Sequence, residues 1–143
     1  MRNFAVDLAV ILVALTACGD DVSGPSDIEG VYQLRLLNGE QLPYDHEGLG
    51  CCTYLSGTFR LEGGGYELSI TSRNRNTDLV FTATEWGTYV HQAASLMFAP
   101  DSADVAPLLL DVATISTDSL RVAFGGEGPG SPDQFQSLFV RSP

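Results

Sequence analysis

Apolar and polar residues alternate with a period of two in a series of short runs along this chain, and this alternation leaves few folds open to it. The runs recur from residue 30 to residue 141 and are rich in Val, Thr, Tyr and Phe. No stretch after Gly24 has a sustained apolar period of 3.6 residues, which an amphipathic helix would show. The chain beyond Gly24 is therefore predicted to be nearly all β.

Turn signals divide these runs into strands. In residues 30–37, Tyr32, Leu34 and Leu36 occupy every second position and therefore one face of the expected strand. The run stops at Asn38-Gly39, a strong hairpin signal. The clearest hairpin joins residues 54–61 to residues 66–72 through a glycine-rich turn. Its apolar face is expected to consist of Leu55, Phe59 and Leu61 with Tyr66, Leu68 and Ile70. Further strands are expected over residues 79–85, 87–91, 94–99, 108–116, 120–124 and 135–141, with a loop over residues 100–107.

About eight or nine antiparallel strands joined by short turns leave sheet edges that must be protected. A closed up-and-down barrel removes these edges and is the predicted architecture, with an open sandwich as the alternative. The chain has 143 residues, of which 44% are hydrophobic, and this suits one globular domain. The fold class is therefore all-β, as a single antiparallel barrel.

The first seventeen residues have the pattern of an export signal, with Arg2 followed by an apolar run over residues 8–17. That run is too short for a transmembrane helix, which needs about 20 residues. It ends in Leu15-Thr16-Ala17-Cys18, which resembles the lipobox of bacterial lipoproteins. The resemblance implies that Cys18 carries lipid and anchors the protein to a membrane of the bacterial cell envelope, facing the periplasm or the exterior. A buried N-terminal strand or helix is the alternative.

The expected organisation is a signal peptide over residues 1–17, a lipidated Cys18 with a flexible tether to residue 27, and a barrel domain over residues 28–143. The formal net charge is −11, and loss of the leader leaves it unchanged because the leader contains one arginine and one aspartate. So acidic a surface repels nucleic acids and anionic headgroups. Nucleic acid is therefore excluded as a partner, and the lipid is expected to provide membrane association.

Several enzyme classes lack the residues that they require. The chain contains no lysine, which excludes lysine-dependent phosphate loops and Schiff-base chemistry, and it has no Gly-x-Ser-x-Gly nucleophile motif. Residues 125–130 are rich in glycine but contain Pro129, and a hairpin connection explains them better than a phosphate loop. Arg73 and Arg75 are interpreted as a solvated hairpin tip, with anion recognition as the alternative. No enzymatic activity is predicted.

The histidines and cysteines do not have metal-site spacing. His46 and His91 form no His-x-x-x-His motif, and no Cys-x-x-Cys occurs, so neither a metal nor a cofactor is predicted. Residues 101–104 lack the central glycine of a calcium loop. Cys51 and Cys52 are adjacent, with Cα atoms about 3.8 Å apart across a trans peptide. This leaves open free thiols with one facing inward as a structural residue, a strained vicinal disulfide, or an intermolecular bridge.

Four short motifs follow one another along the chain: Glu29-Gly-Val-Tyr32, Asn38-Gly-Glu-Gln-Leu-Pro43, Ser56-Gly-Thr-Phe-Arg-Leu61 and Trp86-Gly-Thr-Tyr89. Together they resemble the small lipocalin-like domains of bacterial lipoproteins and, more distantly, the META-type β domains, over residues 28–141. In lipocalins a Gly-x-Trp motif opens the first strand, and an arginine near the end of the last strand packs over its ring. Here Gly30 and Tyr32 match the motif, with tyrosine in place of tryptophan. The resemblance implies that Arg141 packs over Tyr32 and closes one end of the barrel.

A barrel of eight strands is either filled by its own side chains or hollowed for one small ligand, and both remain open. The aromatic residues expected to face inward are Tyr32, Phe59, Tyr66, Phe81, Tyr89, Phe98 and Phe139. The first six of these are the candidate ligand contacts. The predicted function is that of a lipid-anchored barrel that binds a small apolar ligand or serves as a passive envelope protein. The alternative is an interaction or inhibitor module whose rim loops, 38–53 and 100–107, contact a partner protein.

Overall fold

The computed structural model describes residues 27–45, 51–127, 131 and 133–143, and it is almost entirely β. The strands are β1 (Gly30–Leu37), β2 (Glu40–Gln41), β3 (Tyr44–Asp45), β4 (Cys52–Glu62), β5 (Gly65–Asn74), β6 (Val80–Gln92), β7 (Ser95–Ala103), β8 (Ala113–Ile115), β9 (Ser119–Phe124) and β10 (Phe135–Arg141). Within these described ranges, no helix has the length and apolar character needed to cross a membrane.

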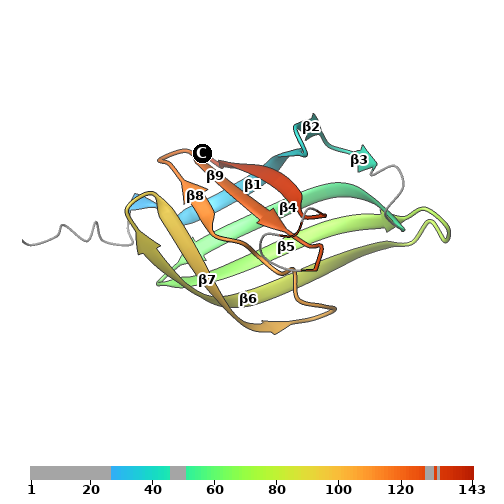
Figure 1. The fold of residues 1–143 in the computed structure, drawn as a ribbon. Helices are drawn as coiled ribbons and strands as arrows, with labels where there is room; N and C mark the ends of the chain where they lie inside the picture. The colour runs from blue at the N-terminus through green and yellow to red at the C-terminus, as the bar shows by residue number, and fades with distance from the viewer. Residues whose placement is uncertain (1–26, 46–50, 128–130, 132) are drawn as a thin grey trace, which may run out of the picture.

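Eight strands close into an up-and-down antiparallel barrel (Figure 1). The ring runs β1-β10-β9-β8-β7-β6-β5-β4, and β4 pairs back onto β1, with Gly30 opposite Leu61 and Tyr32 opposite Phe59. The short strands β2 and β3 pair with the end of β1 and the start of β4. The predicted closed barrel is therefore confirmed, and closure pairs both long edges of every strand in the ring.

Two tight turns follow directly from glycine-containing sequences. Asn38 and Gly39, between β1 and β2, have φ angles of 51° and 84°, and Gly63 and Gly64, between β4 and β5, have φ angles of 56° and 78°. Two successive positive φ angles form the turn whose twist matches that of the flanking strands. Both turns lie where the sequence predicts them. The β6–β7 turn, at residues 93–94, lies one residue later than the sequence indicates.

Bulges shift the alternation in β1 and β4. The register of β1 breaks between Leu34 and Leu36, so Leu37 is buried and Leu36 is not. The alternation places Leu36 on the same face as Tyr32 and Leu34, and this prediction is wrong because one extra residue turns the rest of a strand onto its other face. In β4 the register breaks between Tyr54 and Ser56, and Tyr54, instead of the expected Leu55, packs against the core.

The segment between β7 and β8 differs most from the prediction. β7 continues to Ala103, and only Ala113–Ile115 forms a strand where residues 108–116 were expected to. Residues 104–112, here called the strap, are held to β6 and β9 by backbone hydrogen bonds such as Asp104 N to Thr84 O (3.0 Å) and Gly125 N to Leu108 O (2.6 Å). Pro107 lacks an N–H donor and Leu109 has a φ of 53°, and neither suits a strand.

Aromatic and aliphatic side chains fill most of the barrel. The Phe59 ring centroid lies 5.8 Å from that of Tyr66, 5.4 Å from that of Phe98 and 5.6 Å from that of Phe139. The buried core residues lie between Ile28 and Phe139. A chain that starts at Gly24 therefore contains the whole barrel and its core, and we expect it to fold by itself.

Candidate functional site

Arg141 closes one end of the barrel. Its Cζ lies 5.9 Å from the Tyr32 ring centroid, and its guanidinium donates to the backbone carbonyls of Asp27 (3.1 Å), Thr117 (3.4 Å) and Glu29. A Cβ at Gly30 would lie 3.0 Å from Nε of Arg141, so only glycine lets the guanidinium come this close. This is the contact expected of Arg141 over Tyr32.

The opposite end of the barrel contains an apolar pocket of about 210 Å³. The pocket lies at the start of β4, whereas Arg141 lies beside the start of β1, which pairs with the end of β4. None of the described residues that line it is charged. The lining residues are Cys51, Cys52, Tyr54, Ile70, Ser72, Phe81, Ala83, Pro107, Leu108, Phe124, Gly125 and Phe135. Such a lining favours an apolar ligand.

Aromatic rings form much of the pocket wall. The ring centroids of Tyr54 and Phe135 are 4.9 Å apart, and those of Phe124 and Phe135 are 5.8 Å apart. Burial raises the pKa of Tyr54, so its phenol stays neutral at ordinary pH. A dry cavity of about 150 Å³ holds benzene. The pocket therefore has room for a single ring with a short substituent.

A disulfide between Cys51 and Cys52 forms another part of the wall. Of the states that the sequence leaves open, the structure shows the vicinal disulfide. Cys51 lies in a bend and β4 begins only at Cys52, so the two side chains are not held on opposite faces of one strand. Cys51 is exposed and Cys52 is buried, which places the disulfide at the pocket mouth.

The structure separates the six aromatic residues proposed as ligand contacts. Only Phe81 lines the pocket, where it remains 39% exposed. The other five, Tyr32, Phe59, Tyr66, Tyr89 and Phe98, lie in or against the filled core. Sequence reasoning missed Tyr54 because of the bulge in β4, whereas the alternation in β9 and β10 could have identified Phe124 and Phe135. The barrel is thus filled over most of its length and hollow at one end.

Glu85 is a buried acid that the sequence analysis did not single out. It is 1% exposed, and its Oε1 accepts a hydrogen bond from the Tyr66 hydroxyl (2.7 Å) while its Oε2 accepts one from the Leu108 backbone N–H (2.6 Å). Burial, and next the hydrogen bond to Glu85, raise the pKa of Tyr66 strongly, so the phenol keeps its proton and donates. Glu85 shares the inward face of β6 with Phe81 and Tyr89, so the alternation along this strand could have identified it as an acid inside the barrel.

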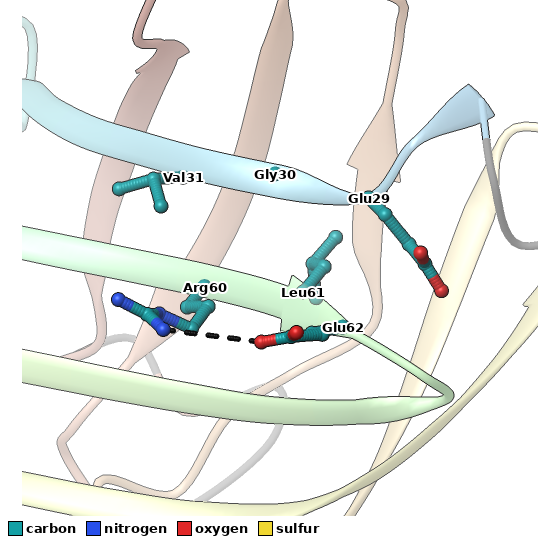
Figure 2. Close-up of a pocket in the computed structure, with 6 residues that line it drawn as sticks. All are labelled: Glu29, Gly30, Val31, Arg60, Leu61 and Glu62. Atoms are coloured by element: carbon teal, nitrogen blue, oxygen red, sulfur yellow. Dashed lines mark ion pairs between the residues drawn. The ribbon is translucent and has the colours of Figure 1, made fainter.

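A second hollow, of about 370 Å³, lies on the outer surface over the start of β1 and the end of β4 (Figure 2). It is lined by Glu29, Gly30, Val31, Arg60, Leu61 and Glu62. The Arg60 guanidinium lies 3.8 Å from the Glu62 carboxylate, and both side chains are largely exposed. An ion pair in this setting contributes little stability, and the open hollow offers no buried polar group to a ligand.

Two further candidates from the sequence, Cys18 and His46, lie outside the described residues. Among the residues that are described, no three His, Cys, Asp or Glu side chains gather closely enough to hold a metal ion. Arg73 pairs with Asp78 (3.6 Å) at the solvated β5–β6 turn. Comparison of the chain with protein-family models, curated proteins and solved structures gives no match.

Proposed function

We propose that this protein is an exported, lipid-anchored β-barrel that binds a small apolar molecule. The observation that supports this is the pocket of about 210 Å³, whose described lining residues carry no charge, in a barrel that is otherwise filled. Removing apolar surface from water drives binding to such a wall. The net charge of −11 disfavours anionic ligands such as fatty acids.

The position of the pocket fits attachment through Cys18. The barrel begins at Gly30, beside Arg141, and β4 runs 11 residues from the pocket end to that end (Figure 1). At about 3.3 Å per residue this strand is about 35 Å long, so the two ends are well separated. The chain therefore enters the barrel at the end opposite the pocket, so attachment through Cys18 leaves the pocket mouth unobstructed. Acyl chains supply about 0.8 kcal/mol per buried methylene to the anchor.

The closed end supports a lipocalin-like assignment. Gly30 opens β1, Tyr32 follows it on the inner face, and the guanidinium of Arg141 covers the ring from the last strand. This is the arrangement that the resemblance to lipocalins implies. We therefore propose that the chain is a bacterial lipoprotein with a small lipocalin-like barrel.

Binding of toluene to the chain from Gly24 onwards, produced in an oxidising compartment, tests the ligand proposal. Ala83 lines the pocket, so Ala83→Leu fills it, whereas Ala99→Leu adds the same atoms to the exposed side of β7. Calorimetry should show binding to the wild type and to Ala99→Leu, and none to Ala83→Leu. Absence of binding to the wild type, or equal binding to all three, refutes the pocket. If the pocket is refuted, the interaction module is the alternative. Capture of an envelope protein by the wild type, lost when rim loops 38–53 and 100–107 are changed, would support it.

The full chain expressed in a bacterium tests the anchor. Wild-type protein should carry acyl chains by mass spectrometry and should partition into the detergent phase. Cys18→Ser should abolish both, while Ser23→Ala should leave both unchanged. An unmodified Cys18 in the wild type would contradict the lipoprotein assignment.

A further inference from the structure

We infer that Glu85 and the pocket form one binding site for a small apolar amine, in which Leu108 takes the place of the ammonium group while the site is empty. This inference rests on the proposed function, since it names the chemical class that the same pocket selects. The ligand combines one apolar ring, which the pocket holds, with a protonated amine, which Glu85 holds.

The first observation is that Glu85 has neutral partners. The ion pairs found among the described residues, Arg60 with Glu62 and Arg73 with Asp78, do not include it. Its two oxygens accept hydrogen bonds from a phenol and a backbone amide. Burying a carboxylate without a cation costs several kcal/mol, and such groups occur where a protein has a use for them. A cationic ligand supplies the missing charge.

The second observation is that Leu108 connects Glu85 to the pocket. Ala83 lines the pocket, and Glu85 is the next inward residue of β6, about 7 Å deeper along the strand. Leu108 lines the pocket, and its N–H donates to Oε2 of Glu85. When Leu108 moves aside, the carboxylate becomes the floor of the pocket. An ammonium N–H then replaces the amide N–H as the donor.

The third observation is that the strap carrying Leu108 is suited to moving. Leu109 has a φ of 53°, which is strained for a bulky residue. Val105, Leu109 and Val112 expose their apolar side chains to water. Moving Leu108 breaks the hydrogen bond from Gly125 N–H to its carbonyl (2.6 Å) as well as its own bond to Glu85, but a strained and largely exposed segment opens at lower cost than the paired strands around it. The net charge of −11 also draws a cation towards the barrel.

The experiment compares phenethylamine with propylbenzene, which has the same shape without the amine, by calorimetry on the chain from Gly24 onwards. Wild-type protein should bind phenethylamine at least about tenfold more tightly, a difference of about 1.4 kcal/mol. Glu85→Gln should remove this preference and retain propylbenzene binding, because glutamine keeps the shape and loses the charge. Glu40→Gln, which removes an exposed charge from β2, should keep the preference.

The outcomes separate the two proposals. If neither probe binds the wild type, the proposed function fails and this inference fails with it. If both bind equally, or if the preference survives in Glu85→Gln, the pocket stands and the inference is overturned. A measurement on the wild type alone covers the case in which Glu85→Gln does not fold. Phenethylamine should shift the backbone amide resonance of Leu108, and binding that leaves this resonance unchanged overturns the inference.

Discussion

Replacing Gly87 with alanine should destabilise the barrel severely. Gly87 faces the interior on β6, and a Cβ there would lie 2.2 Å from O of Ala99, 2.8 Å from Cα of Pro100 and 2.7 Å from Cε1 of Tyr66. Overpacking costs about 1–3 kcal/mol where neighbouring side chains yield. Two of these three atoms belong to the backbone of β7, so the strand itself has to move. We therefore expect a loss of at least about 3 kcal/mol, out of the roughly 5–15 kcal/mol typical of a domain.

Urea unfolding of the chain from Gly24 onwards, followed by circular dichroism, measures this loss. Gly65→Ala is the matched control, because Gly65 lies on the adjacent strand and pairs with Thr88, next to Gly87. A Cβ at Gly65 would make ordinary contacts, 3.4 Å to Glu62 O and 3.5 Å to Gly87 O. Its stability should change by less than about 1 kcal/mol, in the stabilising direction if at all. Equal losses in the two variants would refute the steric argument.

Three further predictions concern the closed end, the core and the pocket mouth. Arg141→Ala should lower the free energy of unfolding in urea by about 2–3 kcal/mol, because it removes the guanidinium from Tyr32 together with its hydrogen bonds to backbone carbonyls. An unchanged midpoint would show that this contact contributes nothing. Burial raises the pKa of Tyr66 above the ordinary value of 10.0, which means that its phenol ionises more readily in the unfolded chain than in the barrel. The barrel therefore keeps its full stability below pH 10 and loses stability as the pH rises further. The part of the tyrosinate absorbance that Tyr66→Phe removes should therefore appear together with loss of the β signal, and its appearance at pH 10 in a folded barrel would contradict the burial argument. Replacing both Cys51 and Cys52 with serine should lower the free energy of unfolding by only about 1 kcal/mol, because the loop that a disulfide between adjacent residues closes is minimal. Toluene binding should weaken, and unchanged toluene binding would show that the disulfide is not part of the pocket wall.

The sequence was sufficient for most of the strands, two of the turns and the closed barrel. Alternation is a property of each residue and its near neighbours, so Tyr32, Phe59 and Phe139 could be placed inside before any contact was known. Asn38-Gly39 signalled its turn in the same local way. The prediction for Leu36 failed because a bulge depends on how one strand pairs with the next, which no single run of residues records.

The candidate site was largely beyond the reach of the sequence. Leu108 belongs to an apolar run that resembles a strand, yet its position is determined by a carboxylate on β6 and an amide that follows β9. The pocket combines residues from β4, β5, β6, β9 and β10, and the disulfide closes at a bend just before β4. The sequence by itself determined the all-β class, the likeness of the leader to a lipoprotein signal, and the acidic charge, because these depend on residue type and local order. Only the tertiary structure decided which end of the barrel is hollow and which buried acid accepts the Leu108 amide, because both depend on contacts between residues far apart in the chain.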